Sequence, residues 1–322
     1  MKKLFLGFFG IAIGGLFLWV SLRGVTIAEL AALIASMNFS AISVAIAVYW
    51  LAMLVRASRW FLLLREIHPV QFSGVAETLV VGYAVNNLLP ARLGEVFRAV
   101  YAKRILKLGR ARVFGSILIE RILDFCAILV LLVSGLWLTH ITQGANQVPT
   151  FEVIAMNAMA LVGAVIFGVV ALRSGGLNRI PMPDKARLIL DDFRIGLGTL
   201  NRSSALAASG LTIVIWALET YALIWIFLAL SVSLSLWQAI LLMGAVSLST
   251  LVPTAPGYLG TYQLVFAIAM TAFGLSESVG IVASTASQLF LFGSVVIVGL
   301  AFLCRHALQN LGPLEVSNPV AD

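Results

Sequence analysis

Six apolar runs in the sequence are each long enough to cross the hydrocarbon core of a bilayer, which takes about 20 helical residues. They comprise residues 4–22, 41–64, 113–139, 153–172, 205–231 and 279–303. Of the 322 residues, 61% are hydrophobic and only 11% are charged, too few to cover the surface of a soluble protein of this length. We therefore predict an all-α integral membrane protein. A soluble enzyme, a nucleic-acid-binding domain and a disulfide-stapled secreted domain are excluded, although the net charge is +7.

Two further apolar regions, 74–90 and 237–274, are interrupted. The first ends in residues 86–90 (NNLLP), and the second contains residues 253–257 (PTAPG). A proline removes a backbone donor, and the freed carbonyl needs a partner in protein or in a watery cavity. We therefore predict two re-entrant or broken helical regions beside about six full transmembrane helices.

Lysine and arginine are concentrated in two segments. Seven of the 21 lie in residues 92–112 and six in residues 173–202, whereas the connections at 140–152, 232–236 and 274–278 carry none. Because cytoplasmic connections of membrane proteins are enriched in Lys and Arg, the two basic segments are predicted to be cytoplasmic and the three others external.

This orientation fits every connection except for Arg23 and defines the predicted organisation of the chain. Region 74–90 enters from the cytoplasmic side, region 237–274 enters from the outer side, and both termini are cytoplasmic. Residues 1–305 form a single polytopic membrane domain, and residues 306–322 form a short cytoplasmic tail.

The second basic segment has a helical pattern over residues 185–200. Leu190, Phe193, Leu197 and Leu200 recur at helical spacing beside basic residues. This pattern is typical of an amphipathic helix on the anionic inner leaflet. The alternative is a solvated loop whose charges only set the topology.

Cysteine and histidine give no sign of a metal, a cofactor or a disulfide. Cys126 and Cys304 lie in or at the end of apolar runs, with no spacing typical of metal ligands. His68, His140 and His306 occur singly near the ends of segments, as ordinary interfacial residues do.

The two interrupted regions resemble one another. Residues 87–90 (NLLP) are followed by 93–95 (LGE), and residues 250–253 (TLVP) are followed by 259–261 (LGT). Since the charge pattern sends the two regions in from opposite faces, we predict an inverted repeat, in which broken helices meet near the membrane midplane at a ligand site. Helix N-termini at that site would favour an anionic group such as a lipid phosphate.

Charged residues within the apolar segments are the candidates for that site, because each costs at least about 2.5–3.5 kcal/mol at the membrane centre unless it is paired. Glu120, Arg121 and Asp124 share one helical neighbourhood and carry a net negative charge, so a further cation is expected nearby. Glu219 has no charged residue within fifteen positions, so its partner must come from another segment unless it is protonated.

Each of these residues also has a structural interpretation. The candidates for the missing cation are Arg56, Arg59, Arg92 and Arg98. Arg56 and Arg59 are also placed to snorkel to headgroups. The 120–124 cluster could hold helices together, and Asn86 and Asn87 could satisfy backbone groups freed by the break. The prolines of the breaks are architectural under any interpretation: Pro90, Pro253 and Pro256.

Four ordered motifs resemble the flippase-like membrane family that includes the transmembrane region of lysylphosphatidylglycerol synthase. They are R-x-x-R-W at 56–60, N-N-L-L-P-x-R-x-G-E at 86–95, E-R-x-x-D at 120–124 and P-x-x-P-G-x-x-G at 253–260. The resemblance covers roughly residues 5–305. It implies a lipid-headgroup path at matching positions: Arg56, Arg59, Asn87, Arg92, Glu95, Arg98, Glu120, Arg121, Asp124 and Gly257.

What the resemblance implies is a bacterial inner-membrane protein that moves an aminoacylated phospholipid or another lipid between leaflets. Relatives are linked to polyprenyl-linked sugars and to hopanoid production. This sequence has Gln263 where many members carry an acid, and it lacks the soluble aminoacyl-transfer domain, so lysyl transfer is not expected.

The leading hypothesis is therefore a non-enzymatic lipid flippase or transporter whose partners are membrane lipids and, potentially, a lipid-modifying enzyme. No GxxxxGK[ST] motif for ATP is present. An integral membrane transferase that uses Glu120 and Asp124, or a scaffold for a lipid-modifying complex, remains the alternative.

Overall fold

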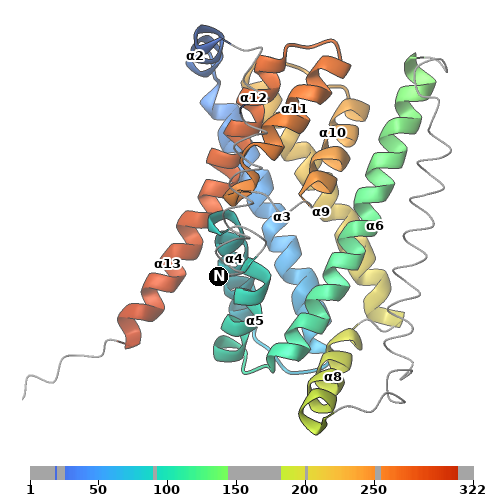
Figure 1. Ribbon diagram of the computed structural model, residues 1–322, viewed down its shortest axis with the longest axis vertical. Coiled ribbons are helices and arrows are strands. Elements are labelled where there is room, and N and C mark those ends of the chain that lie inside the picture. Colours follow the sequence, from blue (N-terminus) through green and yellow to red (C-terminus); the bar gives the residue numbers. More distant parts are fainter. Residues whose placement is uncertain are drawn as a thin grey trace, which may run out of the picture.

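The computed structural model describes residues 19, 26–89, 93–143, 183–199, 202–250 and 255–310, and these residues form helices with no strand among them (Figure 1). Several predicted features lie outside the described residues. They are the spans 4–22 (apart from Trp19) and 153–172, together with Pro90, Arg92 and Pro253.

Four of the six predicted spans are helical in the structure. They are α3 (Phe39–Arg65), α6 (Arg110–Gln143), α9 (Arg202–Ala229) and a continuous helix formed by α12 (Glu277–Ala286), a π-helical segment η4 (Ser287–Phe292) and α13 (Gly293–Asn310). In the described part of the chain, three helices are long and apolar enough to cross a membrane: Phe39–Arg65, Ser204–Ala229 and Glu277–Leu308. The protein is thus an all-helical membrane protein over its described residues.

The ends of these helices follow local capping signals. The Asn38 side chain accepts hydrogen bonds from the backbone N–H groups of Ser40 and Ala41 at the start of α3. At the start of α10 (Leu236–Ser249), Ser235 and Gln238 form a reciprocal capping box. These caps satisfy N–H groups that have no partner within the helix itself.

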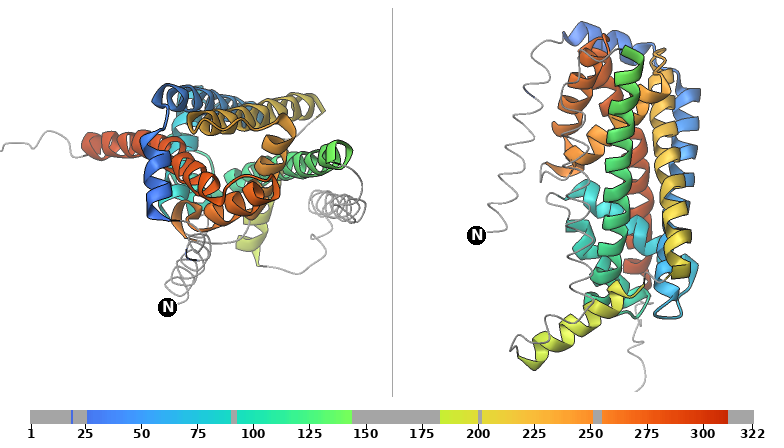
Figure 2. Two further views of the ribbon diagram at one scale, coloured as in Figure 1. Left: turned by 90° about the horizontal axis from the view of Figure 1, so that it is seen from above. Right: turned by 90° about the vertical axis from the view of Figure 1, so that its right-hand side faces the viewer.

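Each interrupted region forms a helical hairpin. The first comprises α4 (Phe72–Leu88) and α5 (Leu93–Ile105), and the second comprises α10, a 3-10 turn η3 (Pro256–Tyr258) and α11 (Thr261–Ala272). The hairpins enter the bundle from opposite ends, and α4 of the first contacts η3 of the second near the middle of the bundle (Figures 1 and 2). The predicted breaks are confirmed, but α5 was not predicted as a separate returning helix.

The helices pack in pairs that span the whole sequence. Helix α3 packs along α9, α6 packs along α10, and α13 packs along α4 (Figure 2). Helices α3 and α9 begin 163 positions apart in the chain, at Phe39 and Arg202. The same separation holds for Arg56 and Glu219, which contact each other between the two helices. Much of the buried apolar core lies between these pairs.

The predicted amphipathic segment is a helix, α8 (Asp184–Leu197), so the loop alternative is wrong. It packs against α6 where Gly115 and Gly196 let the backbones approach closely, and Arg112 Nη2 lies 2.7 Å from Asp192 Oδ1. Helix α8 lies at the same end of the bundle as the α5–α6 connection, at the bottom of Figure 1, so the described parts of both basic segments lie together. A further short helix, α2 (Ile27–Ala35), was not predicted.

Candidate functional site

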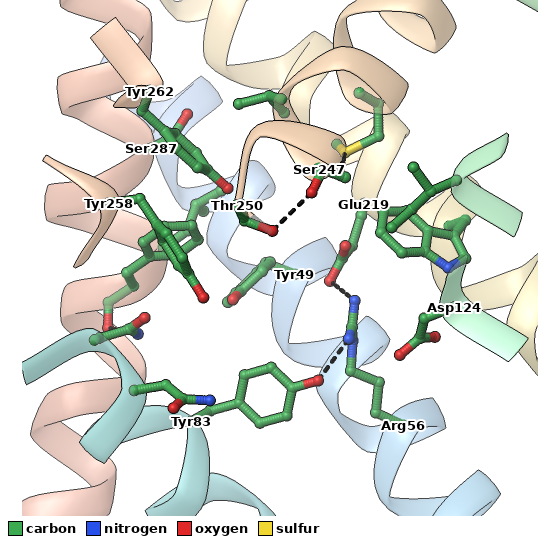
Figure 3. Close-up of a pocket in the computed structure, with 18 of the residues that line it drawn as sticks. Tyr49, Arg56, Tyr83, Asp124, Glu219, Ser247, Thr250, Tyr258, Tyr262 and Ser287 are labelled. Atoms are coloured by element: carbon green, nitrogen blue, oxygen red, sulfur yellow. Dashed lines mark hydrogen bonds and ion pairs between the residues drawn. The ribbon is translucent and has the colours of Figure 1, made fainter. Parts of the chain in front are cut away.

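A cavity of about 430 Å³ lies where the two hairpins meet α3, α6 and α9 (Figure 3). Its lining contains seven of the residues singled out from the sequence: Arg56, Asn86, Asn87, Glu95, Arg121, Asp124 and Glu219. Arg59, Arg98 and Glu120 are buried directly behind this lining. We use "charged cavity" for this space.

The pair Arg56–Glu219 joins α3 to α9 inside the charged cavity. Arg56 Nη2 donates to Glu219 Oε1, and Arg56 Nη1 donates to the Tyr83 hydroxyl at 2.7 Å. The Arg56 guanidinium also lies 5.7 Å from the centre of the Trp216 ring. Figure 3 shows the chain from Tyr83 through Arg56 to Glu219. The predicted partner of Glu219 therefore does come from another segment.

Behind the lining, a cluster of ion pairs ties α3 and α5 to α6. Arg59 Nη1 lies 2.7 Å from Asp124 Oδ1, and Arg59 Nη2 lies 3.5 Å from Glu120 Oε1. Arg98 Nη2 lies 2.7 Å from Glu120 Oε2, although the pair lacks the alignment of a hydrogen bond. The further cation expected near Glu120 and Asp124 is thus supplied by Arg59, with Arg98 as a second.

Burial in this cluster is nearly complete. The Arg59 side chain is 0% exposed and that of Glu120 is 1% exposed. The Arg98 guanidinium lies 3.5 Å from the centre of the Trp60 ring, whose indole N–H donates to Ser116. Charges so deeply buried are tolerated only when paired, so the cluster fixes the geometry of the cavity wall.

Arg121 is the loosely held arginine of the lining. Its side chain is 30% exposed, and its Nε lies 3.7 Å from Glu95 Oε1, too far for a hydrogen bond. Its Nη2 donates to Tyr83 at 3.3 Å and lies 3.2 Å from Asp124. An anion that enters the cavity could replace Glu95 as the partner of Arg121 without breaking a close pair.

The opposite wall of the charged cavity is made of hydroxyl groups that sequence reasoning missed. The side chains drawn there in Figure 3 are Tyr49, Ser247, Thr250, Tyr258, Tyr262 and Ser287. The only available signal was position, since Tyr258 lies inside the second proline–glycine motif and Tyr262 lies four residues later. Their hydroxyls could bond to polar headgroup atoms.

The second hairpin is shaped by neutral groups at its tip. Gly257 has a φ of 61°, a region that favours glycine. Its carbonyl accepts a hydrogen bond from Gln288 Nε2 at 2.8 Å, and Gln288 Oε1 accepts one from Gln263 Nε2 at 2.7 Å. Gln263 therefore holds the hairpin to the π-helical segment, a type of distortion frequent at functional sites.

The side chains of the two asparagines at the first break form hydrogen bonds with backbone groups. Asn86 Oδ1 accepts from the N–H of Gly94 at 2.7 Å, and Asn87 Nδ2 donates to the Phe292 carbonyl at 3.5 Å. A Cβ placed on Gly257 would lie 3.4 Å from the Asn87 carbonyl oxygen, so the two hairpin tips are adjacent.

In the described part of the chain, no group of three or more His, Cys, Asp or Glu is arranged to hold a metal ion.

Comparison with known proteins identifies the family of the chain. Residues 7–299 match the family described as Lysylphosphatidylglycerol synthase TM region. A UPF0104 membrane protein of Methanocaldococcus jannaschii is 25% identical over 185 residues, which cover 56% of this chain and 77% of the relative. A UPF0104 membrane protein of Pyrococcus horikoshii is 22% identical over 284 residues, which cover 80% and 84%. The chain therefore belongs to the family of the lysylphosphatidylglycerol synthase TM region.

Proposed function

We propose that this protein is a lipid flippase or transporter that moves a lipid with a phosphate-containing or aminoacylated headgroup between membrane leaflets. The observation that carries the proposal is the charged cavity, a space of about 430 Å³ with charged and hydroxyl side chains in its lining, inside an apolar helical bundle. Such a space suits a headgroup that must cross the membrane interior while its chains stay in lipid.

One arginine of the cavity, Arg121, supports recognition of an anionic group. Among the described residues of the cavity and its buried cluster, four arginines face four acids, so the site is balanced without a ligand. Arg121, with its long contact to Glu95, is the arginine we assign to the phosphate. The hydroxyl wall would complete the contacts to the rest of the headgroup.

An inverted repeat would supply the movement. Helices α3 and α4 precede the first break as α9 and α10 precede the second, and Pro90 and Pro253 are 163 positions apart, the same offset that separates Arg56 from Glu219. The opposite entry of the two hairpins (Figure 2) also supports this interpretation. In such architectures, rocking of one repeat against the other exposes a central site to each side in turn.

The activity can be measured in vesicles that contain phosphatidylglycerol or phosphatidylethanolamine. Impermeant periodate or an impermeant amine reagent modifies only headgroups in the outer leaflet, so continued modification reports movement from the inner leaflet. We expect the reconstituted protein to expose the inner pool of at least one lipid. If neither lipid is exposed faster than in protein-free vesicles, the proposal is wrong.

Arg121→Gln tests the assigned headgroup contact. Loss of one charge-assisted contact should slow exposure by about tenfold or more, since such hydrogen bonds contribute about 1.5–3 kcal/mol. Arg187→Gln removes the same charge from an exposed position on α8 and is the matched control. Equal exposure rates for the two variants would remove Arg121 from the proposed site.

We also propose that the end of the bundle with α8 faces the cytoplasm, as the positive-inside rule indicates. In a variant without Cys126 and Cys304, Lys185→Cys should react with an impermeant maleimide only from the cytoplasmic side. Ser233→Cys, in the connection between α9 and α10, should react only from outside. The opposite pattern would reverse the orientation.

A further inference from the structure

A second cavity, of about 500 Å³, lies between α6, α9 and the first turns of α10. Unlike the charged cavity, it has no Asp, Glu, Lys or Arg among the described residues of its lining. Part of its rim is exposed: Ile213 is 70% exposed and Tyr221 is 48% exposed. We call this space the α6–α9 groove. Its apolar walls and open rim suit a hydrocarbon chain rather than a polar ligand.

The α6–α9 groove adjoins the charged cavity across a single layer of side chains. Trp216 lines both spaces. On α6, Asp124 faces the charged cavity while Leu123 faces the groove. Thr212, on the groove side, accepts a hydrogen bond from the buried Arg59 at 2.8 Å. A molecule with a polar and an apolar end could therefore occupy both spaces at once.

Trp216 carries an unused donor at this junction. The residue is only 7% exposed, yet its indole Nε1–H has no hydrogen-bond partner among the residues that the structure describes. A buried N–H without an acceptor is unfavourable, and buried tryptophans usually find one. An oxygen at the junction between the headgroup and the chains of a lipid, such as an ester carbonyl, would be a suitable acceptor.

We infer that the α6–α9 groove binds a hydrocarbon chain of the same lipid whose headgroup occupies the charged cavity, with the Trp216 N–H bonded to the oxygen that links the two parts. The inference rests on the proposed function and deepens it. It identifies the ligand as a lipid held at both ends, and it places the lateral opening for the chain between α6 and α9.

The test combines chain labelling with the exposure assay. Phosphatidylglycerol that carries a diazirine at the middle of one acyl chain is reconstituted with the full chain and photolysed, and the adducts are mapped by mass spectrometry. We expect adducts on the groove faces of α6 and α9. Ala217→Trp, which fills the groove from an exposed position, should abolish these adducts and slow headgroup exposure at least about fivefold.

Ala207→Trp is the matched control, because Ala207 is also exposed on α9 but lines neither cavity. Trp216→Phe keeps the ring and removes the N–H, and it should slow exposure without preventing insertion or folding. Thermal unfolding in detergent checks that all three variants fold.

The outcomes separate the inference from the proposed function. If the wild type exposes phosphatidylglycerol but Ala217→Trp exposes it as fast as Ala207→Trp, the inference is wrong and the proposed function stands. If the wild type forms adducts in the groove but Ala217→Trp still exposes the lipid at the rate of Ala207→Trp, the labelled molecule is an ordinary bilayer lipid. That result also makes the inference wrong. If the wild type exposes no lipid, the proposed function fails first. Slow exposure together with lost adducts, in Ala217→Trp alone, supports the inference.

Discussion

The two hairpins that meet at the charged cavity have similar shapes and opposite chemistry. The first, residues 72–105, carries Glu77 on α4 and both acidic and basic residues on α5, whereas the second, residues 236–272, contains no Asp, Glu, Lys or Arg. The first is held by ion pairs, and the second is held by neutral hydrogen bonds and stacked rings.

The contacts of the first hairpin reach the C-terminal helix as well as α6. Glu77 accepts hydrogen bonds from Tyr101 at 2.7 Å and from Arg305 at 2.9 Å, and it lies 2.6 Å from His306 Nε2. In the second hairpin, by contrast, the rings of Tyr258 and Tyr262 stack with centres 5.9 Å apart. Since buried ion pairs cost more to separate than neutral contacts, we expect the first hairpin to be the fixed wall and the second to be the moving one.

The largest expected effect comes from removing the centre of the ion-pair cluster. Arg59→Ala leaves Asp124 and Glu120 buried without this partner and should destabilise the fold by about 3–5 kcal/mol. Thermal and chemical unfolding in detergent measure the loss. Arg112→Ala, which breaks a half-exposed pair with Asp192, should change stability by about 1 kcal/mol or less. Similar losses for the two variants would show that the cluster does not fix the cavity wall.

A medium effect on stability is expected from removing one side chain that holds each hairpin to its neighbours. Glu77→Ala removes an acceptor shared by three partners and should cost about 1.5–3 kcal/mol. Gln263→Ala removes neutral hydrogen bonds to Gly260 and Gln288 and should cost about 1 kcal/mol. The same unfolding measurement compares the two, and a greater loss for Gln263→Ala would reverse the assignment of fixed and moving walls.

The smallest expected effect concerns the tip of the second hairpin. Gly257→Ala places a Cβ on a residue with a φ of 61° and should cost about 1 kcal/mol. The change should also alter the rate of lipid exposure, because the tip contacts the first hairpin. Gly210→Ala is the control: its Cβ would meet nothing within 4 Å, and alanine favours a helix by up to about 1 kcal/mol. A stabilised Gly257→Ala variant would mean that the tip does not need its present conformation.

Much of the architecture could be predicted because a helix that crosses the membrane needs about 20 consecutive, mostly apolar residues. Uninterrupted apolar runs gave α3, α6 and α9 to within a few residues, and prolines marked where α4 and α10 end. The return of the chain through α5 was not predicted, since residues 93–105 are charged and look like a cytoplasmic connection. Two of these charged residues, Arg98 and Glu95, pair with Glu120 and Arg121 of α6, which no local pattern reveals.

The sequence identified charged residues of the candidate site but not which of them form ion pairs with each other. Charge at membrane depth identified Glu219 and Asp124, but the choice between Arg56 and Arg59 as their partners depends on how α3 packs, which the sequence does not state. His306 was interpreted as an ordinary interfacial residue, yet it contacts Glu77, 229 positions away. The tyrosines of the cavity were missed because tyrosine in an apolar run has no distinctive signal.

The contact between Arg56 and Glu219 bears on how a chain of this kind can arise. The two residues occupy the same place in two helices whose starts are 163 positions apart. A dimer of two identical half-length chains would set the same side chain against itself there, and two like charges would repel in the low-dielectric interior. Opposite charges at this point therefore require two segments of different sequence, which one continuous chain can supply and two copies of one half cannot.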